Sequence, residues 1–252
     1  MSSKKVEFQN SNGQILSARL ELPDNEAAKH YAIFAHCFTC NKNLSAVRNI
    51  SRSLNNYGIA VLRFDFTGLG ESEGEFADTN FSSNVQDLID AANFLEQEYQ
   101  APSLLIGHSL GGAAVLFAAA QILSVKAVAT IGAPSSPAHV KHLLQNGLED
   151  IEKYGSAKIA IGGRPFNVSR QFLQDIQSQN MDDVLKNLRK PILILHSPLD
   201  SIVGIGQAEN IFKAARHPKS YISLDGADHL LSNAKDSEYA GKVIAGWADR
   251  YL

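Results

Sequence analysis

The sequence has little cysteine and no excess of positive charge, and each shortage excludes a class of protein. Two cysteines among 252 residues cannot form the disulfide framework of a small secreted domain. With 23 basic and 26 acidic side chains the formal net charge is −3, so no basic field attracts nucleic acid or an anionic membrane. The polar N-terminus lacks the apolar core of a signal peptide, and no apolar run reaches the ~18 residues of a membrane span. We therefore expect a cytoplasmic protein with neither a nucleic-acid partner nor a membrane span.

The sequence does contain enough apolar material for a large core, because hydrophobic residues make up 44% of it and charged residues 19%. Two period-two segments flank an Asn12-Gly13 pair and predict an N-terminal antiparallel hairpin. Further along, short apolar runs alternate with helical spacing, which predicts an α/β fold with a mostly parallel central sheet and helices on both faces. The expected strands are 6–9, 15–22, 31–35, 59–64, 103–106, 127–131, 192–195 and 220–224, and the expected helices are 44–57, 81–99, 110–123, 208–215 and 237–251.

Residues 131–191 interrupt this alternation and show no sheet-like rhythm. They contain helical stretches around 138–154 and 168–188, with a turn at Gly162-Gly163-Arg164-Pro165 between them. An insertion of this length in a compact α/β domain is typical of a functional lid. We expect a single domain over 1–252 with a small, mainly helical cap inserted at about 135–190.

A candidate nucleophile lies between the strand 103–106 and the helix that begins at residue 110. The segment Gly107-His108-Ser109-Leu110-Gly111-Gly112 fits the G-x-S-x-G pattern of a nucleophile elbow, a sharp strand-to-helix turn that lifts the serine above the sheet. The same turn directs the Leu110 N–H, at a helix N-terminus, toward the place where an oxyanion forms. The pattern alone is weak, and a serine that caps the helix is the alternative.

A serine nucleophile needs a base, and the base needs an acid that orients it. Asp200 follows the strand 192–195 and His229 follows the strand 220–224, in the order Ser, acid, His that this architecture uses. The other usual place for the acid, residues 132–135, offers no carboxylate. Asp225 and Asp228 are alternatives for the acid, but their closeness to His229 favours a role in capping the turn. The other histidines weighed are His108 beside the serine, expected to point away from it, His139 and His142 in the cap, and His217 in a loop.

The loop after residue 35 reads His36-Cys37-Phe38-Thr39-Cys40, and the Phe38 N–H is the candidate second oxyanion donor. Cys37 and Cys40 form a C-x-x-C pair, but further residues, among them Lys42 and Asn43, separate it from the helix expected at Leu44, which is a poor position for thioredoxin-like chemistry. A zinc site lacks further ligands at suitable spacing, so we expect no metal. We expect a pair of inert thiols; the alternative is a pair that oxidises and distorts the oxyanion loop.

With these residues in order, the chain resembles the α/β-hydrolase superfamily across essentially its whole length. The loop from Asp65 to Gly74 is similar to the segment after the fourth strand in many members, where we expect a structured turn. The loop 36–40 together with the Asp65 loop resembles the hydrolase portion of proteins in which an OsmC-like domain follows. That domain is not within these 252 residues, so the chain is either a stand-alone member or a piece of a longer protein.

One position departs from the superfamily pattern. Many members carry His-Gly in the oxyanion loop, where the glycine lets the backbone turn freely, and here Cys37 replaces the glycine. We expect the oxyanion hole still to form, because a cysteine side chain is small.

Together these residues predict a serine hydrolase that cleaves an ester or related acyl bond of a small molecule through an acyl-enzyme, without a cofactor. Ser109, Asp200 and His229 form the predicted triad. Carboxylesterase, thioesterase, amidase and acyltransferase share such a triad, and fold and triad do not choose among them; we take a carboxylesterase as the first expectation. Two other classes stay open: an idle hydrolase scaffold used for binding, and a thiol-redox accessory protein that uses Cys37 and Cys40.

Overall fold

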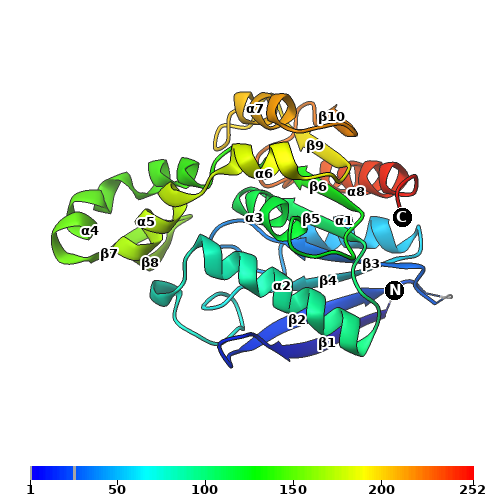
Figure 1. Ribbon diagram of the computed structural model, residues 1–252, viewed down its shortest axis with the longest axis horizontal. Coiled ribbons are helices and arrows are strands. Elements are labelled where there is room, and N and C mark those ends of the chain that lie inside the picture. Colours follow the sequence, from blue (N-terminus) through cyan, green and yellow to red (C-terminus); the bar gives the residue numbers. More distant parts are fainter. Residues whose placement is uncertain (1, 25–26) are drawn as a thin grey trace.

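The computed structural model describes residues 2–24 and 27–252 and contains an eight-stranded central sheet (Figure 1). Its strands are β1 (Ser2–Gln9), β2 (Ile15–Leu22), β3 (His30–Ala35), β4 (Ile59–Phe64), β5 (Leu104–His108), β6 (Ala127–Ile131), β9 (Ile192–His196) and β10 (Lys219–Ser223), in the spatial order β1-β2-β4-β3-β5-β6-β9-β10. β2 pairs antiparallel with both β1 and β4, and the other neighbours pair in parallel. The predicted α/β class, with an N-terminal hairpin and a mostly parallel sheet, is confirmed.

Most strand boundaries lie within two residues of those predicted, and β1 differs most. It begins at Ser2, four positions before the first apolar residue of the pattern, Val6. Residues 2–5 are exposed, so no hydrophobic periodicity marks them, but their backbone continues the ladder to Ser2 opposite Leu22. Backbone pairing therefore extends the strand beyond its apolar face.

Helices cover both faces of the sheet (Figure 1). α1 (Ser45–Asn55) and α8 (Ala234–Ala248) contribute to one apolar cluster, whereas α2 (Phe81–Glu98), α3 (Leu110–Ala119) and α7 (Gly206–Ala214) contribute to the other. Every residue of β4, β5 and β6 is buried, as expected for parallel strands covered on both sides. No helix in the described part of the chain is long and apolar enough to cross a membrane.

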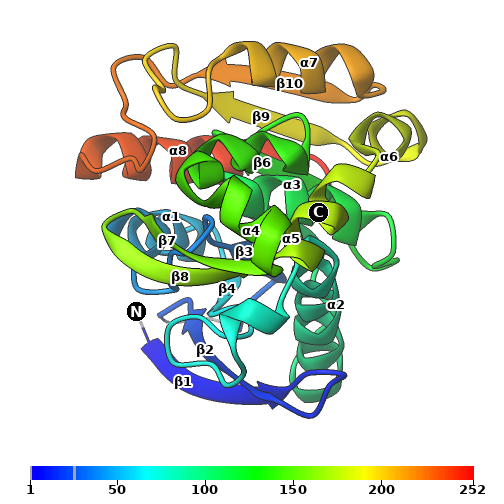
Figure 2. The ribbon, with the colours of Figure 1, turned by 90° about the vertical axis from the view of Figure 1, so that its left-hand side faces the viewer.

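The segment between β6 and β9 is called the cap below, and its part labelled α4, β7, β8 and α5 lies in front of the sheet in Figure 2. It contains η2 (Pro137–Gly147), α4 (Leu148–Tyr154), β7 (Ser156–Ile161), β8 (Arg164–Ser169), α5 (Arg170–Ser178) and α6 (Met181–Asn187). The helical stretches agree with the prediction, but β7 and β8 form an antiparallel hairpin that was not predicted. Its turn is Gly162-Gly163, both with positive φ, a two-residue connection that favours hairpins. The sequence signal was therefore present, but the two strands are short, and β8 contains only two large apolar residues, Phe166 and Val168.

Candidate active site

Ser109 occupies the turn between β5, which ends at His108, and α3, which begins at Leu110. Its backbone has φ 55° and ψ −126°, a conformation that a residue with a side chain rarely adopts. The turn is held because the Ser109 N–H donates to the Ile131 carbonyl at 2.9 Å, and the Ser109 carbonyl accepts from the Gly112 N–H at 2.8 Å. Ser109, the predicted nucleophile, therefore lies at the carboxyl end of β5.

The glycines around Ser109 allow the strand, the helix and the loop after β3 to approach one another. A Cβ on Gly107 would lie 2.3 Å from the Gly111 carbonyl oxygen, inside α3. A Cβ on Gly111 would lie 2.4 Å from the His36 carbonyl oxygen and 2.6 Å from that of Ala35, at the end of β3. Since these neighbours are backbone atoms, neither position has room for a side chain.

Asp200 and His229 lie in the loops after β9 and β10 and contact each other directly. Asp200 Oδ2 accepts a hydrogen bond from His229 Nδ1 at 2.7 Å, while Asp200 Oδ1 accepts from the amides of Ile202 at 2.9 Å and Val203 at 2.8 Å. Burial would raise the pKa of Asp200, but the hydrogen bonds from His229 and these amides outweigh it and lower the pKa below its ordinary value. The carboxylate therefore fixes the proton of the neutral imidazole on Nδ1 and leaves Nε2 free to accept one.

Gly132 links this pair to the serine. It follows Ile131, whose carbonyl binds the Ser109 N–H, and its own φ is +55°. A Cβ on Gly132 would lie 3.1 Å from Asp200 Oδ2 and 3.4 Å from His229 Nδ1. The end of β6 therefore contacts the elbow on one side and the acid and imidazole on the other.

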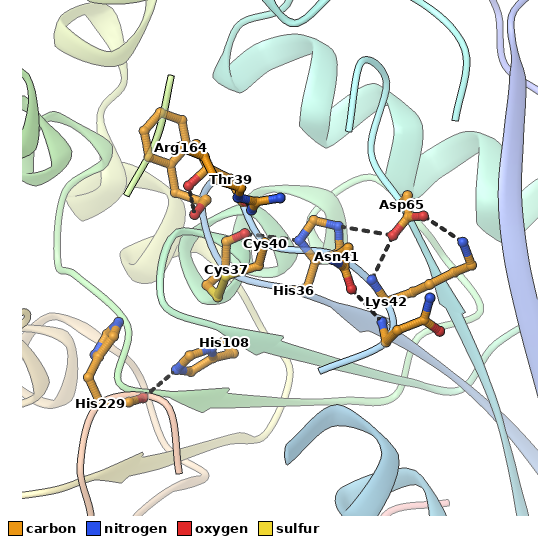
Figure 3. Close-up of a disulfide and its surroundings, with 12 residues drawn as sticks. His36, Cys37, Thr39, Cys40, Asn41, Lys42, Asp65, His108, Arg164 and His229 are labelled. Atoms are coloured by element: carbon orange, nitrogen blue, oxygen red, sulfur yellow. Dashed lines mark hydrogen bonds and ion pairs between the residues drawn. A yellow bond between two sulfur atoms is a disulfide. The ribbon is translucent and has the colours of Figure 1, made fainter. Parts of the chain in front are cut away.

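Two buried histidines support the pair, and sequence reasoning assigned neither of them this role. His108 Nε2 donates to the His229 carbonyl at 2.7 Å, and His196 Nε2 donates to the Val203 carbonyl at 2.7 Å (Figure 3 shows the first). Burial, with the nearby His229, lowers the pKa of His108 to about 3, so its ring stays neutral. The first contact joins residues 121 positions apart, and no local pattern signals it.

The two rival carboxylates bind groups of their own turn. Asp225 accepts from the Ser223 hydroxyl at 2.5 Å, and Asp228 accepts from the Ser232 N–H at 2.8 Å. Both contacts are local, of the kind that stabilises turns. The carboxylate that binds the His229 ring nitrogen is that of Asp200.

The loop after β3 contains a disulfide between Cys37 and Cys40, whose Cα atoms are 5.3 Å apart (Figure 3). The expectation of two inert thiols was therefore wrong. The reason is that the two cysteines lie across a tight turn, in which the Cys40 N–H donates to the Cys37 carbonyl at 3.0 Å, so their side chains are within bonding range. Thr39, inside this turn, has φ +60°.

A buried ion pair anchors the far end of this loop to the Asp65 turn. Asp65 accepts from the Lys42 N–H at 2.6 Å, from Lys42 Nζ at 2.5 Å and from the Glu71 N–H at 3.0 Å. The Lys42 side chain is completely buried, which is tolerable only because its charge is paired. A Cβ on Gly70 would overlap the Asp65 carboxylate, so this glycine makes room for the ion pair. The Asp65 segment is a structural turn that supports the loop.

Aromatic contacts connect the loop to the cap. The Phe38 ring stacks on Phe172 of α5 with centroids 5.3 Å apart, and Phe76 lies 4.9 Å from Phe166 of β8. Arg164 of the cap donates to the Thr39 carbonyl (Figure 3). A mainly apolar pocket is lined in part by Phe38, Phe66, Leu69, Phe76, Leu110 and Ala114.

Across residues 2–24 and 27–252, no three His, Cys, Asp or Glu side chains are placed together so as to hold a metal ion.

Comparison with known proteins places the chain in a family. A family model described as serine aminopeptidase, S33 matches residues 32–145. The esterase domain of a Rhodothermus marinus protein is 51% identical and superposes with a TM-score of 0.82, and the match covers 100% of this chain and 99% of that domain. The chain therefore belongs to the α/β-hydrolase superfamily.

Matches to curated proteins are more distant and partial. The uncharacterized protein YfhR of Salmonella typhi is 25% identical over 190 residues, which are 75% of this chain and 61% of YfhR. Rat monoglyceride lipase is 30% identical over 114 residues, which are 44% of this chain and 37% of the lipase. The matched part of the chain thus spans about three fifths of YfhR and less of the lipase.

Proposed function

We propose that this chain is a serine hydrolase that cleaves an ester or related acyl bond through a covalent acyl-enzyme. The Ser109 hydroxyl attacks the acyl carbon while His229 Nε2 takes its proton, and Asp200 holds the imidazole in the required tautomer. The backbone N–H groups of Phe38 and Leu110 stabilise the oxyanion. His229 returns the proton to the leaving alcohol, and water then releases the acyl group by the same steps in reverse.

The observation that carries this proposal is the 2.7 Å hydrogen bond between His229 Nδ1 and Asp200 Oδ2, beside the strained backbone of Ser109. A serine held at φ 55° between packed glycines stores strain that an ordinary helix cap does not need. A scaffold used only for binding does not require a strained serine beside a hydrogen-bonded imidazole and carboxylate. An active nucleophile is therefore favoured over a binding scaffold.

A carboxylic ester with an uncharged acyl group is the substrate class that fits best. The pocket beside Leu110 is lined mainly by aromatic and aliphatic side chains, and no carboxylate is among its described lining residues. An aminopeptidase would need such a carboxylate to bind the substrate's ammonium group. The esterase domain from Rhodothermus marinus and the rat monoglyceride lipase, both similar to this chain, also support an ester.

Labelling with a fluorophosphonate probe, followed by peptide mapping, tests the proposal without the natural substrate. We expect label on Ser109 of the wild type and none on Ser109→Ala or His229→Ala. Circular dichroism of each variant controls for folding. A folded wild type that takes up no label would contradict the proposal and favour the idle scaffold.

The two candidate acids provide a matched pair in the same assay. Asp200→Asn should lower the labelling rate by roughly 10⁴-fold, because the amide favours the wrong imidazole tautomer. Asp228→Asn makes the same chemical change in the turn beside His229 and should leave the rate within about twofold, since its carboxylate caps Ser232. The reverse result would assign the acid to Asp228.

A further inference from the structure

The Phe38 N–H, the proposed oxyanion donor, belongs to the same peptide group as the Cys37 carbonyl. Its orientation therefore depends on the hydrogen bonds that the Cys37 carbonyl accepts. That carbonyl accepts from His36 Nδ1 at 2.9 Å and from the Cys40 N–H at 3.0 Å. In a trans peptide the C=O and N–H point in opposite directions, so the Phe38 N–H is directed away from both donors. Within the described residues the Phe38 N–H has no protein acceptor, which leaves it available to a substrate.

The turn from Cys37 to Cys40 sets the orientation of the Phe38 N–H, but Thr39 disfavours the backbone conformation of this turn. Thr39 has φ +60°, and the left-handed region is sterically disfavoured for a β-branched residue. The Cys37–Cys40 disulfide closes the turn on either side of Phe38 and Thr39 and keeps the Cys40 N–H beside the Cys37 carbonyl (Figure 3). Without the bond, Thr39 can relax and the Cys37–Phe38 peptide can rotate.

The two ends of this disulfide differ in burial. Cys37 is 4% exposed, whereas Cys40 is half-buried. A dithiol attacks the Cys40 sulfur as a thiolate, the S–S bond breaks, and Cys37 leaves as a thiolate that is then protonated. The second thiol of the reductant displaces Cys40 from the mixed disulfide, so the reductant is oxidised to a disulfide while the protein gains two electrons and two protons.

We propose that the Cys37–Cys40 disulfide is a positioning element for the Phe38 oxyanion donor, and that its reduction by a dithiol slows acyl transfer at Ser109. The inference rests on the serine-hydrolase function proposed above. It makes turnover depend on the redox state of the compartment, since dithiol systems keep protein thiols reduced in the cytosol.

The expected effect is specific to the reaction step. An oxyanion donor acts on charge that develops in the transition state, so a misplaced donor lowers kcat and leaves KM nearly unchanged. Complete loss of one donor lowers kcat about 10²–10³-fold, and a loosened donor keeps part of its effect, so we expect about a tenfold loss. The disulfide closes a ring over a sequence separation of three, so reduction should change global stability little.

The test compares oxidised and dithiothreitol-reduced wild type, with free thiols titrated in each, in hydrolysis of p-nitrophenyl acetate. We expect kcat to fall about tenfold on reduction, with KM within about twofold, and to recover on reoxidation. The inhibition constant of phenylboronic acid, which forms a tetrahedral adduct with the serine, should rise by the same factor. Equal kcat in two preparations with different thiol titres, or a change confined to KM, would overturn the inference.

A paired variant separates the disulfide from other effects of the reductant. Cys37→Ser with Cys40→Ser should have the kcat of the reduced wild type and should not respond to dithiothreitol. A double variant with the oxidised kcat would overturn the inference. Fluorophosphonate labelling distinguishes the two proposals: no label on Ser109 in either redox state overturns the proposed function, whereas label with equal turnover in both states overturns only this inference.

Discussion

The two proposed oxyanion donors belong to regions that are built in different ways. Leu110 lies in the elbow of residues 107–112, where glycines let backbone pack on backbone. Phe38 lies in the oxyanion loop of residues 36–42, where the backbone is held by a disulfide, an imidazole, a buried ion pair and a cap arginine. The elbow depends on the absence of side chains, and the loop depends on their presence. The donor in the loop is therefore the one that redox state, charge and cap position can affect.

The largest expected effect breaks the elbow. Gly111→Ala forces a Cβ to within 2.4 Å of the His36 carbonyl oxygen and should lower the free energy of unfolding by roughly 3 kcal/mol or more. Gly246→Ala is the matched control, because Gly246 lies exposed in α8 with no atom within 4 Å of the place a Cβ would take, and it should raise stability by about 0.5–1 kcal/mol. Urea denaturation measures both. Equal stability of the two variants would show that the elbow tolerates a side chain.

The next largest effect concerns a buried carboxyl that supports the Asp65 turn, on the loop side of this comparison. Asp87 of α2 accepts from the Thr67 N–H and hydroxyl, both at 2.9 Å, and so holds the turn that carries Asp65. Burial raises the pKa of Asp87 to about 6. Because the folded pKa lies above the unfolded value of 3.8, this group's stabilisation is complete below pH 3.8 and is lost as the pH rises to about 6.

Replacing the Asp87 carboxyl should therefore remove its contribution to the pH dependence of the unfolding free energy. The unfolding free energy of wild type minus that of Asp87→Asn should fall by about 2 kcal/mol between pH 4 and pH 7. Denaturation of both proteins in the same buffers provides the difference, in which the contributions of other groups cancel. Parallel curves across this range would show that Asp87 keeps an ordinary pKa.

The smallest effect tests a single hydrogen bond in the loop. His36→Leu removes the Nδ1–H that binds the Cys37 carbonyl and should lower kcat about fivefold with little change in KM. His36→Asn places an amide N–H close to the position of Nδ1 and should keep kcat within about twofold of wild type. Steady-state kinetics on the p-nitrophenyl ester measures both variants. Equal losses in the two would assign His36 a packing role in place of the hydrogen bond.

The fold could be predicted closely because its signals are local. Strands β2, β4 and β6 have the predicted boundaries, since apolar periodicity and flanking glycines mark them in the sequence. The β7–β8 hairpin of the cap was missed although Gly162-Gly163 marks its turn. Its strands are short and only partly buried, so they carry less of the apolar pattern that the prediction uses.

The candidate site divides in the same way. Ser109, Asp200 and His229 follow from motif and strand order, and the structure brings the last two into direct contact. His108 and His196 also contact this site, but through hydrogen bonds to distant backbone groups that no motif encodes. The roles of these residues in catalysis remain predictions that the labelling experiment tests.

The sequence by itself determined the α/β class, the order of its elements and the glycines of the elbow, because periodicity and backbone sterics act over a few residues. Only the tertiary structure decided that Cys37 and Cys40 are joined, that Lys42 is buried against Asp65 and that Arg164 reaches the loop. These contacts depend on how a turn closes and on which distant segments meet. Packing and the pairing of buried polar groups determine which of these contacts form, and both act only once the chain has folded.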